Sequence, residues 1–135
     1  MIRQLDDRMM VSGQIAPHEV AGLAEQGVTV IVNNRPDGEE DGQPLAADIE
    51  AAAADANIPY HFVPIIRGIG PADVEEMQKA LRQAEGGKLL AFCRSGRRSA
   101  MALGIAKREE GASADEVHRC LTDAGFDSSP IAHLL

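Results

Sequence analysis

The chain has 135 residues, of which 44% are apolar and 25% are charged, proportions typical of an ordinary globular protein. This length is enough to bury a sizeable core, and the sequence contains no repeat, low-complexity tract or linker, so we expect one domain over residues 1–135. The formal net charge of -8 disfavours nucleic acid and acidic membrane surfaces as partners.

The first residues of the chain and its apolar runs indicate the cellular compartment. Residues 1–7 contain no apolar core of a signal peptide. No apolar run approaches the roughly 20 residues that a membrane span needs. We therefore expect a cytoplasmic protein whose two cysteines, Cys93 and Cys120, stay reduced.

Hydrophobic periodicity predicts strands and helices that alternate along the chain. In chain order these are an edge hairpin at 2–6 and 9–12, a helix begun by Pro17 and ended by Gly27, a strand at 28–32, a helix at 45–56, a strand at 60–63, a helix begun by Pro71 and ended at Gly86, a strand at 88–92, a helix at 99–110, a helix capped by Ser113, and a short last helix capped by Ser129-Pro130. Such alternation is typical of βαβ units. The sequence predicts a three-layer α/β domain with a mainly parallel central sheet flanked by helices.

The turn between strand 88–92 and the following helix is the strongest candidate site. Cys93 comes directly after the strand, where backbone N–H groups and the dipole of a following helix favour negative charge. Arginines stand at positions 94, 97 and 98 of a chain that is acidic as a whole. We expect this turn to hold an anion and to keep Cys93 as a nucleophilic thiolate.

A second polar loop follows strand 28–32, at the carboxyl edge of the sheet where ligands of open α/β sheets bind. Right-handed crossovers place this loop and the Cys93 turn on the same rim. We expect Arg35 or Asp37 to reach the site, with Asp37 alternatively orienting an arginine of the turn. The acidic run 39–41 is predicted to be solvated.

Other reactive residue types carry weaker signals. The histidines at 18, 61, 118 and 133 share no metal-ligand spacing with each other or with the cysteines, so we predict no metal site and no cofactor. Cys120 is predicted to be a core thiol of its helix. Gly68 and Gly70 suggest a loop that can bend near the site.

The Cys93 turn resembles the active-site loops of two enzyme families. In protein tyrosine and dual-specificity phosphatases, a Cys and an Arg bracket five residues, and Ser or Thr follows the Arg. In single-domain rhodaneses the loop is one residue shorter, often Cys-Arg-Ser-Gly-X-Arg-Ser. Here Cys93 and Arg98 bracket four residues and Ser99 follows, which matches the shorter loop.

The rest of the chain lacks the Gly-His-Ile-Pro-Gly-Ala and Asp-Val-Arg segments of rhodaneses. It instead resembles the phosphatase-like domain of the beta-lactamase-hydrolase-like proteins, a small bacterial family. The matching segments are 11–14, the helix after Pro17, 30–40, Tyr60 and the Cys93 turn. The resemblance implies a cysteine-phosphatase-like fold of the tyrosine-phosphatase type. Members are described both as phosphatases and as sulfurtransferases, so the resemblance leaves the reaction open.

Three features favour sulfur transfer. The shorter loop gives a narrower ring of N–H donors, which suits a Cys-bound sulfur better than a phosphoryl group. Phe92 stands where tyrosine phosphatases usually have His. The loop 64–68 has no acid where dual-specificity enzymes carry a general-acid Asp, and Asp73 is typical of the first turn of a helix.

Our hypothesis from the sequence is that Cys93 takes sulfur from a small anionic donor, such as thiosulfate or glutathione persulfide. The resulting persulfide would pass to a thiol acceptor or to cyanide. In this hypothesis Arg98 clamps the donor, the amides of 94–98, including those of Ser95 and Gly96, stabilise its charge, and the Ser99 hydroxyl tunes the thiolate. Arg94 and Arg97 raise the local anion concentration.

Two alternatives stay open. In the first, the chain is a phosphatase in which Cys93 forms a phosphocysteine from a phosphorylated substrate. One of the carboxyl groups of Asp37, Glu39, Glu40 or Asp73 must then act as the general acid. In the second, the turn is a non-catalytic anion-binding or redox-sensing module. Both enzyme hypotheses need a Cys93 sulfur that is accessible to solvent, with a hollow between it and an Arg98 guanidinium turned toward it.

Overall fold

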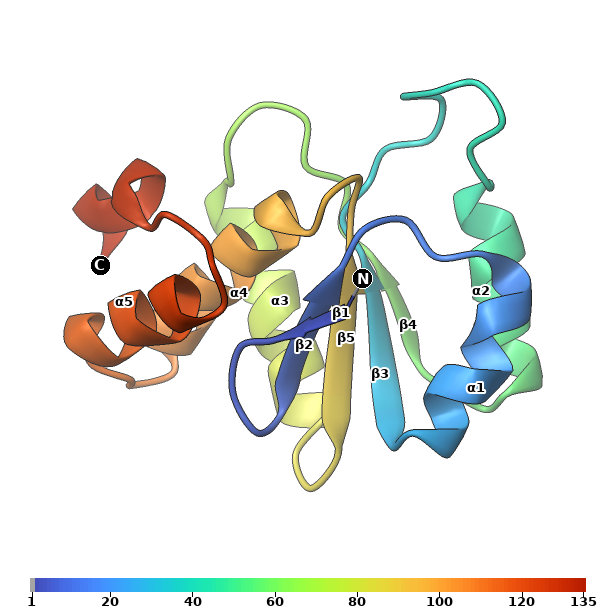
Figure 1. Ribbon diagram of the computed structural model, residues 1–135, viewed down its shortest axis with the longest axis horizontal. Coiled ribbons are helices and arrows are strands. Elements are labelled where there is room, and N and C mark those ends of the chain that lie inside the picture. The colour runs from blue at the N-terminus through green and yellow to red at the C-terminus, as the bar shows by residue number, and fades with distance from the viewer. Residues whose placement is uncertain (1) are drawn as a thin grey trace.

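The computed structural model describes residues 2–135, which form one five-stranded sheet with helices on both faces (Figure 1). The strands are β1 (Ile2–Gln4), β2 (Met9–Ser12), β3 (Val28–Asn33), β4 (Tyr60–Phe62) and β5 (Lys88–Phe92). Their order across the sheet is β1-β2-β5-β3-β4, and only β1 runs antiparallel to its neighbour. The predicted α/β architecture and the antiparallel edge hairpin are confirmed.

The helices divide between the two faces of the sheet. They are α1 (Val20–Glu25), preceded by a short 3-10 helix (Pro17–Glu19), α2 (Ala46–Asp55), α3 (Pro71–Gln83), α4 (Arg97–Glu109), α5 (Ala114–Asp123) and a C-terminal 3-10 helix, η2 (Ser129–Leu134). Figure 1 shows α1 and α2 on one side of the sheet and α3, α4 and α5 on the other. Among residues 2–135, no helix is long and apolar enough to span a lipid bilayer.

Strand β5 lies in the middle of the sheet because both of its faces are apolar. Successive side chains of a strand point to opposite faces. Leu90 and Phe92 pack in the cluster under α1 and α2, whereas Leu89 and Ala91 pack in the larger cluster under α3 and α4. All four side chains are fully buried, so packing on both faces fixes the position of β5 in the sheet. Cys93, the next residue, is fixed with it.

The edge hairpin is pinned to the body of the protein by one carboxylate. Asp6 Oδ1 accepts hydrogen bonds from the backbone N–H groups of Arg8 and Met9, both at 2.8 Å. Its Oδ2 lies 2.6 Å from Lys107 Nζ of α4. The Asp6 side chain therefore stabilises the turn of the hairpin and also links it to α4.

Two expectations about the helices need correction. Helix α4 begins at Arg97 rather than Ser99, because Gly96 adopts φ +91° and caps the helix two residues earlier. Cys120 is half-buried rather than part of the core. The inner face of α5 is formed by Val117 and Leu121, and Cys120 lies at its margin, with Sγ 3.7 Å from Lys107 Nζ.

Candidate active site

The loops that follow β3, β4 and β5 meet at one end of the sheet, at the top in Figure 1. Backbone hydrogen bonds hold their first residues together. The Asn34 N–H donates to the Phe92 carbonyl at 2.8 Å, and the Ile65 N–H donates to the Asn34 carbonyl at 3.0 Å. The structure thus places the Cys93 turn and the loop bearing Arg35 on the same rim, as the sequence predicts.

The Cys93 sulfur lies at the N-terminus of α4. The Gly96 N–H donates a hydrogen bond to Sγ at 3.2 Å. The Cys93 N–H donates to the Ser12 carbonyl of β2 at 3.3 Å, which holds the residue against the sheet. The sulfur therefore lies beside the first amides of a 13-residue helix, at the positive end of the helix dipole, where anions bind.

Two glycines allow the backbone to fold around the sulfur. A Cβ at Gly13 would lie 2.9 Å from the Arg94 carbonyl oxygen, closer than side-chain carbons come to backbone. Gly96 has φ +91°, and a Cβ there would lie 3.4 Å from the Ser12 backbone. The segment after β2 and the Cys93 turn therefore approach each other as closely as they do only because both residues lack a side chain.

The guanidinium of Arg98 is held from two sides. Its Nη1 donates to the Ile65 carbonyl oxygen and to Glu39 Oε2, both at 2.8 Å, and its Nη2 donates to Glu39 Oε1 at 2.8 Å. The Glu39 carboxylate, with a further contribution from the Cys93 sulfur, raises the pKa of Arg98 above its usual range. Arg98 is therefore a permanent cation beside Cys93, as predicted.

Arg35 is the other guanidinium of the rim, and only 2% of its side chain is exposed. It donates from Nε to Glu39 Oε1 at 2.9 Å, from Nη1 to Gln14 Oε1 at 3.1 Å and from Nη2 to Glu40 Oε1 at 3.1 Å. Hydrogen bonds from Arg98 and then Arg35 lower the pKa of Glu39 from 4.5 to about 2. Glu39 is ionised at neutral pH.

The prediction of an exposed acidic run at 39–41 is confirmed, since all three residues are exposed, and Glu39 and Glu40 in addition form ion pairs with Arg35. A buried arginine needs carboxylate partners, because an unpaired buried charge is costly. The signal in the sequence is that these two glutamates come four and five residues after Arg35 across a Pro-Asp-Gly turn, which folds them back onto its side chain.

Asp37 has a structural role at the rim. Its Oδ1 accepts a hydrogen bond at 2.8 Å from the Ala46 N–H, the first amide of α2, so it neither reaches the turn nor orients an arginine there. Asp73 acts similarly in α3, where its Oδ2 accepts from the Gly70 N–H at 2.9 Å. Both aspartates cap helices, as residues of this type often do.

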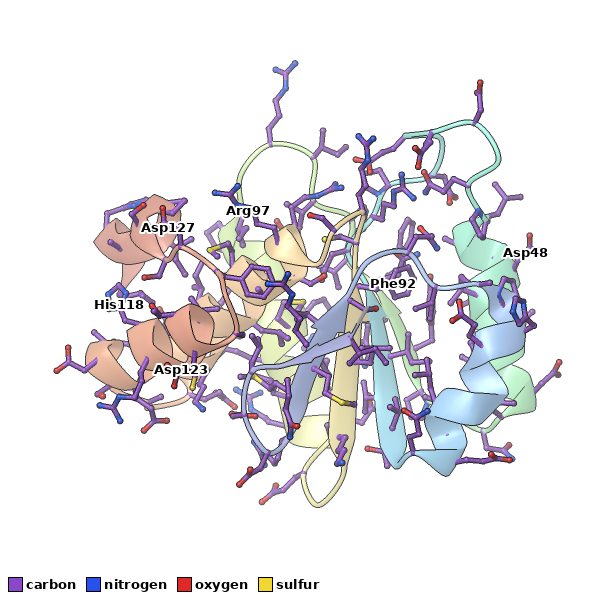
Figure 2. All side chains as sticks on the ribbon, viewed as in Figure 1. Asp48, Phe92, Arg97, His118, Asp123 and Asp127 are labelled. Carbon is purple, nitrogen blue, oxygen red and sulfur yellow. The ribbon has the colours of Figure 1, made fainter. Side chains whose placement is uncertain are left out.

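The remaining predicted residues of the turn divide into exposed and buried groups. Arg94, Ser95 and Arg97 are exposed, and Arg94 Nη2 lies 3.7 Å from Glu40 Oε2. Figure 2 shows Arg97 at the start of α4, on the side of Asp127. Ser99 is fully buried, and its hydroxyl donates to Asn34 Oδ1 at 2.8 Å. Because a hydroxyl has one proton to donate, Ser99 supports the rim here and donates no hydrogen bond to the Cys93 sulfur.

The exposure of Cys93 differs from the expectation. Only 1% of the residue is exposed, so Cys93 is buried and not accessible as expected. The Arg98 and Glu39 side chains are 26% and 27% exposed.

Comparison with known proteins identifies the family. Residues 1–109 match the model for the family described as "Beta-lactamase hydrolase-like protein, phosphatase-like domain". The chain belongs to this family. A beta-lactamase hydrolase-like protein of Xylella fastidiosa is 37% identical over 128 residues, which are 93% of this chain and 30% of that protein. The chain thus spans about 30% of the length of this curated relative.

Solved structures agree with the fold. A crystal structure from Neisseria meningitidis, of a protein named provisionally as a phosphatase, superposes with a TM-score of 0.79 at 32% identity and covers 98% of this chain and 94% of that one. Kinase-associated phosphatase superposes with a TM-score of 0.72 at 17% identity, covering 93% of this chain and 83% of that one. The expected cysteine-phosphatase-like fold is confirmed.

The glycine at position 96 provides a test of the turn. We expect Gly96→Ala to destabilise the protein by about 1–2 kcal/mol, because alanine is strained at positive φ. The change also moves the N–H that contacts the sulfur. Urea unfolding of the variant measures the loss. Gly22→Ala is the matched control, since a Cβ at Gly22 of α1 meets nothing within 4 Å. An equal loss in both variants would contradict this account.

The depressed pKa of Glu39 predicts a pH dependence. The folded protein binds the Glu39 proton near pH 2, whereas the unfolded chain binds it near pH 4.5, so the ion pair stabilises the fold above pH 4.5 and is lost as the pH falls toward 2. We expect Glu39→Gln to lose on the order of 1 kcal/mol of stability at pH 7 and progressively less below pH 4.5. Urea unfolding at several pH values measures this difference. Glu50→Gln, on the exposed side of α2, should show no such trend.

Proposed function

We propose that the chain is a cysteine-dependent phosphatase of the tyrosine-phosphatase type that hydrolyses phosphate monoesters. The observation that carries this proposal is the Cys93 sulfur at the N-terminus of α4, bonded to the Gly96 N–H, with the Arg98 guanidinium fixed beside it. The phosphatase fold and the relative from Neisseria meningitidis, named provisionally as a phosphatase, support the same reaction.

The reaction proceeds in two displacements. The Cys93 thiolate attacks phosphorus, and the bond from phosphorus to the ester oxygen breaks, its electron pair leaving with that oxygen. Water then attacks the phosphocysteine, the sulfur–phosphorus bond breaks, and the electron pair returns to sulfur. The proton of that water passes to solvent with release of inorganic phosphate.

The turn would stabilise the phosphoryl oxygens in both steps. Of the five N–H groups of Arg98, three are bonded to Glu39 and Ile65. The Nε–H and one Nη2–H are left to hold two phosphoryl oxygens. The backbone amides of residues 94–98 supply further donors, which are most effective where charge develops.

The carboxyl groups named as candidate acids are engaged elsewhere. Asp37 and Asp73 cap helices, Glu39 is ionised with a pKa of about 2, and Glu40 pairs with Arg35. A leaving oxygen must then depart without a proton from these groups. The proposed enzyme therefore prefers weakly basic leaving groups, such as those of aryl phosphates.

Sulfur transfer is the second candidate, favoured by the four-residue spacing between Cys93 and Arg98 and by the engagement of those acids. When Cys93 takes sulfur from a small anionic donor, the rest of the donor leaves as a stable anion, so this step needs no general acid. The comparisons give no support to this reaction, whereas the matched structures include phosphatases. We therefore rank it below phosphate hydrolysis.

The deciding experiment assays the purified chain with p-nitrophenyl phosphate, with thiosulfate and cyanide, and with glutathione persulfide. We expect phosphate release that falls at least about a thousandfold in Cys93→Ser, because the nucleophile is lost. Cys120→Ser is the matched control and should retain activity. Cys93-dependent thiocyanate formation without phosphate release would establish sulfur transfer instead. Turnover of none of these substrates would favour a binding or sensing module.

Arg98 provides a second test of the mechanism. We expect Arg98→Lys to lower kcat/KM for p-nitrophenyl phosphate about a hundredfold, because lysine cannot form the paired, planar hydrogen bonds of a guanidinium. Arg94→Lys, at a side chain that is 66% exposed, should change it less than about threefold. Equal effects of the two substitutions would contradict the assignment of Arg98 as the anion clamp.

A further inference from the structure

An apolar cleft of about 450 Å³ lies directly beside the Cys93 turn. Its walls come from the loop after β4, from α4 and from η2, and the apolar side chains in them are Ile65, Ile66, Ile69, Met101, Ile131 and Leu134. Arg97 and Arg98 also line it. The cleft thus combines apolar side chains with two arginines from the start of α4.

Two apolar side chains of this cleft are unusually exposed to solvent. Ile66 is 75% exposed and Leu134 is 45% exposed, and they are two of the five large apolar side chains most exposed to solvent among the described residues. Exposed apolar area of this kind is unfavourable in water and is typical of binding surfaces.

Arg98 connects the cleft to the proposed reaction centre. Its Nη1 donates to the carbonyl oxygen of Ile65, which is itself a wall residue, and its guanidinium lies beside the Cys93 sulfur. A phosphate held on the turn by Arg98 therefore has the cleft within reach of its ester group. This continuity and the positive charge of the two arginines together select an anion that carries an apolar substituent.

A second cavity, of about 660 Å³, shares Ile69 and Leu134 with this cleft. Val74 of α3 and Ile105 of α4 also line it, together with polar and charged side chains of both helices. A single aromatic ring fills only part of such a space.

We propose that this cleft binds the aliphatic chain of an amphiphilic phosphate monoester whose phosphate sits on the Cys93 turn. The inference rests on the proposed phosphatase function, and it names the class of substrate. The chain contributes binding energy away from the reacting atoms, so it lowers KM more than it changes kcat.

A series of 4-alkylphenyl phosphates of increasing chain length tests the proposal, at concentrations below those at which they form micelles. The para substituent scarcely alters the basicity of the leaving oxygen, so differences report on binding. We expect KM to fall about two- to fourfold for each methylene that enters the cleft, with kcat nearly constant. A KM that does not depend on chain length would overturn the proposal.

Substitutions locate the effect. Ile66→Ala and Leu134→Ala should each weaken the dependence of KM on chain length, and both positions are exposed enough for the fold to tolerate the change. Leu45→Ala is the matched control, because Leu45 is 53% exposed at the start of α2 and lies outside the cleft. An equal effect of Leu45→Ala would show nonspecific hydrophobic binding and overturn the proposal.

Binding without turnover separates this inference from the proposed function. In the Cys93→Ser variant, alkylphosphonates of increasing length are titrated by calorimetry. Chain-dependent affinity that Ile66→Ala weakens supports the cleft even if no phosphate ester is hydrolysed, in which case only the phosphatase proposal fails. If aryl phosphates are hydrolysed but binding does not depend on chain length, the phosphatase proposal stands and the proposal for the cleft is overturned.

Discussion

The Glu39 carboxylate holds the rim of this protein together. It accepts hydrogen bonds from two guanidiniums, those of Arg98 at the start of α4 and Arg35 in the loop after β3. Arg35 in turn bonds Gln14 in the segment before α1, and Arg98 bonds the Ile65 carbonyl in the loop after β4. Four loops from distant parts of the chain are thus joined through one anion. Charge-assisted hydrogen bonds of this kind are among the stronger polar contacts in proteins.

The same carboxylate limits the chemistry of the site. An acid with a pKa of about 2 does not donate a proton at neutral pH, so Glu39 positions Arg98 rather than protonating a leaving group. It takes up one edge of the guanidinium and leaves the Nε–H and an Nη2–H for a bound anion. Arg35, almost fully buried, is a cation for Glu39 and not for substrate. Precise placement of one cation is what the network supplies to catalysis.

The sequence predicts those features that depend on local patterns. The bounds of β5 follow from the apolar run 89–92 after Lys88, and the position of Cys93 follows from that strand together with the arginines after it. The Glu39–Arg98 pair is a contact between residues 59 apart, and no local pattern specifies it. The burial of Cys93 and the marginal position of Cys120 likewise depend on how loops and helices pack, which periodicity does not fix.

The spacing between Cys93 and Arg98 is the point at which sequence and structure favour different reactions. The shorter loop suggests a ring of amides too narrow for a phosphoryl group. In the structure, the Gly96 N–H donates to the Cys93 sulfur. The Arg98 guanidinium, which would bind the phosphoryl oxygens together with the amides, is held by Glu39 and Ile65, both outside the turn. Loss of one amide donor therefore weakens the cradle without removing its strongest contact, because that contact is a charge-assisted pair. In the proposed phosphatase, the cleft beside Arg98 would hold the rest of the ester, a role that sulfur transfer from a small anion would not require.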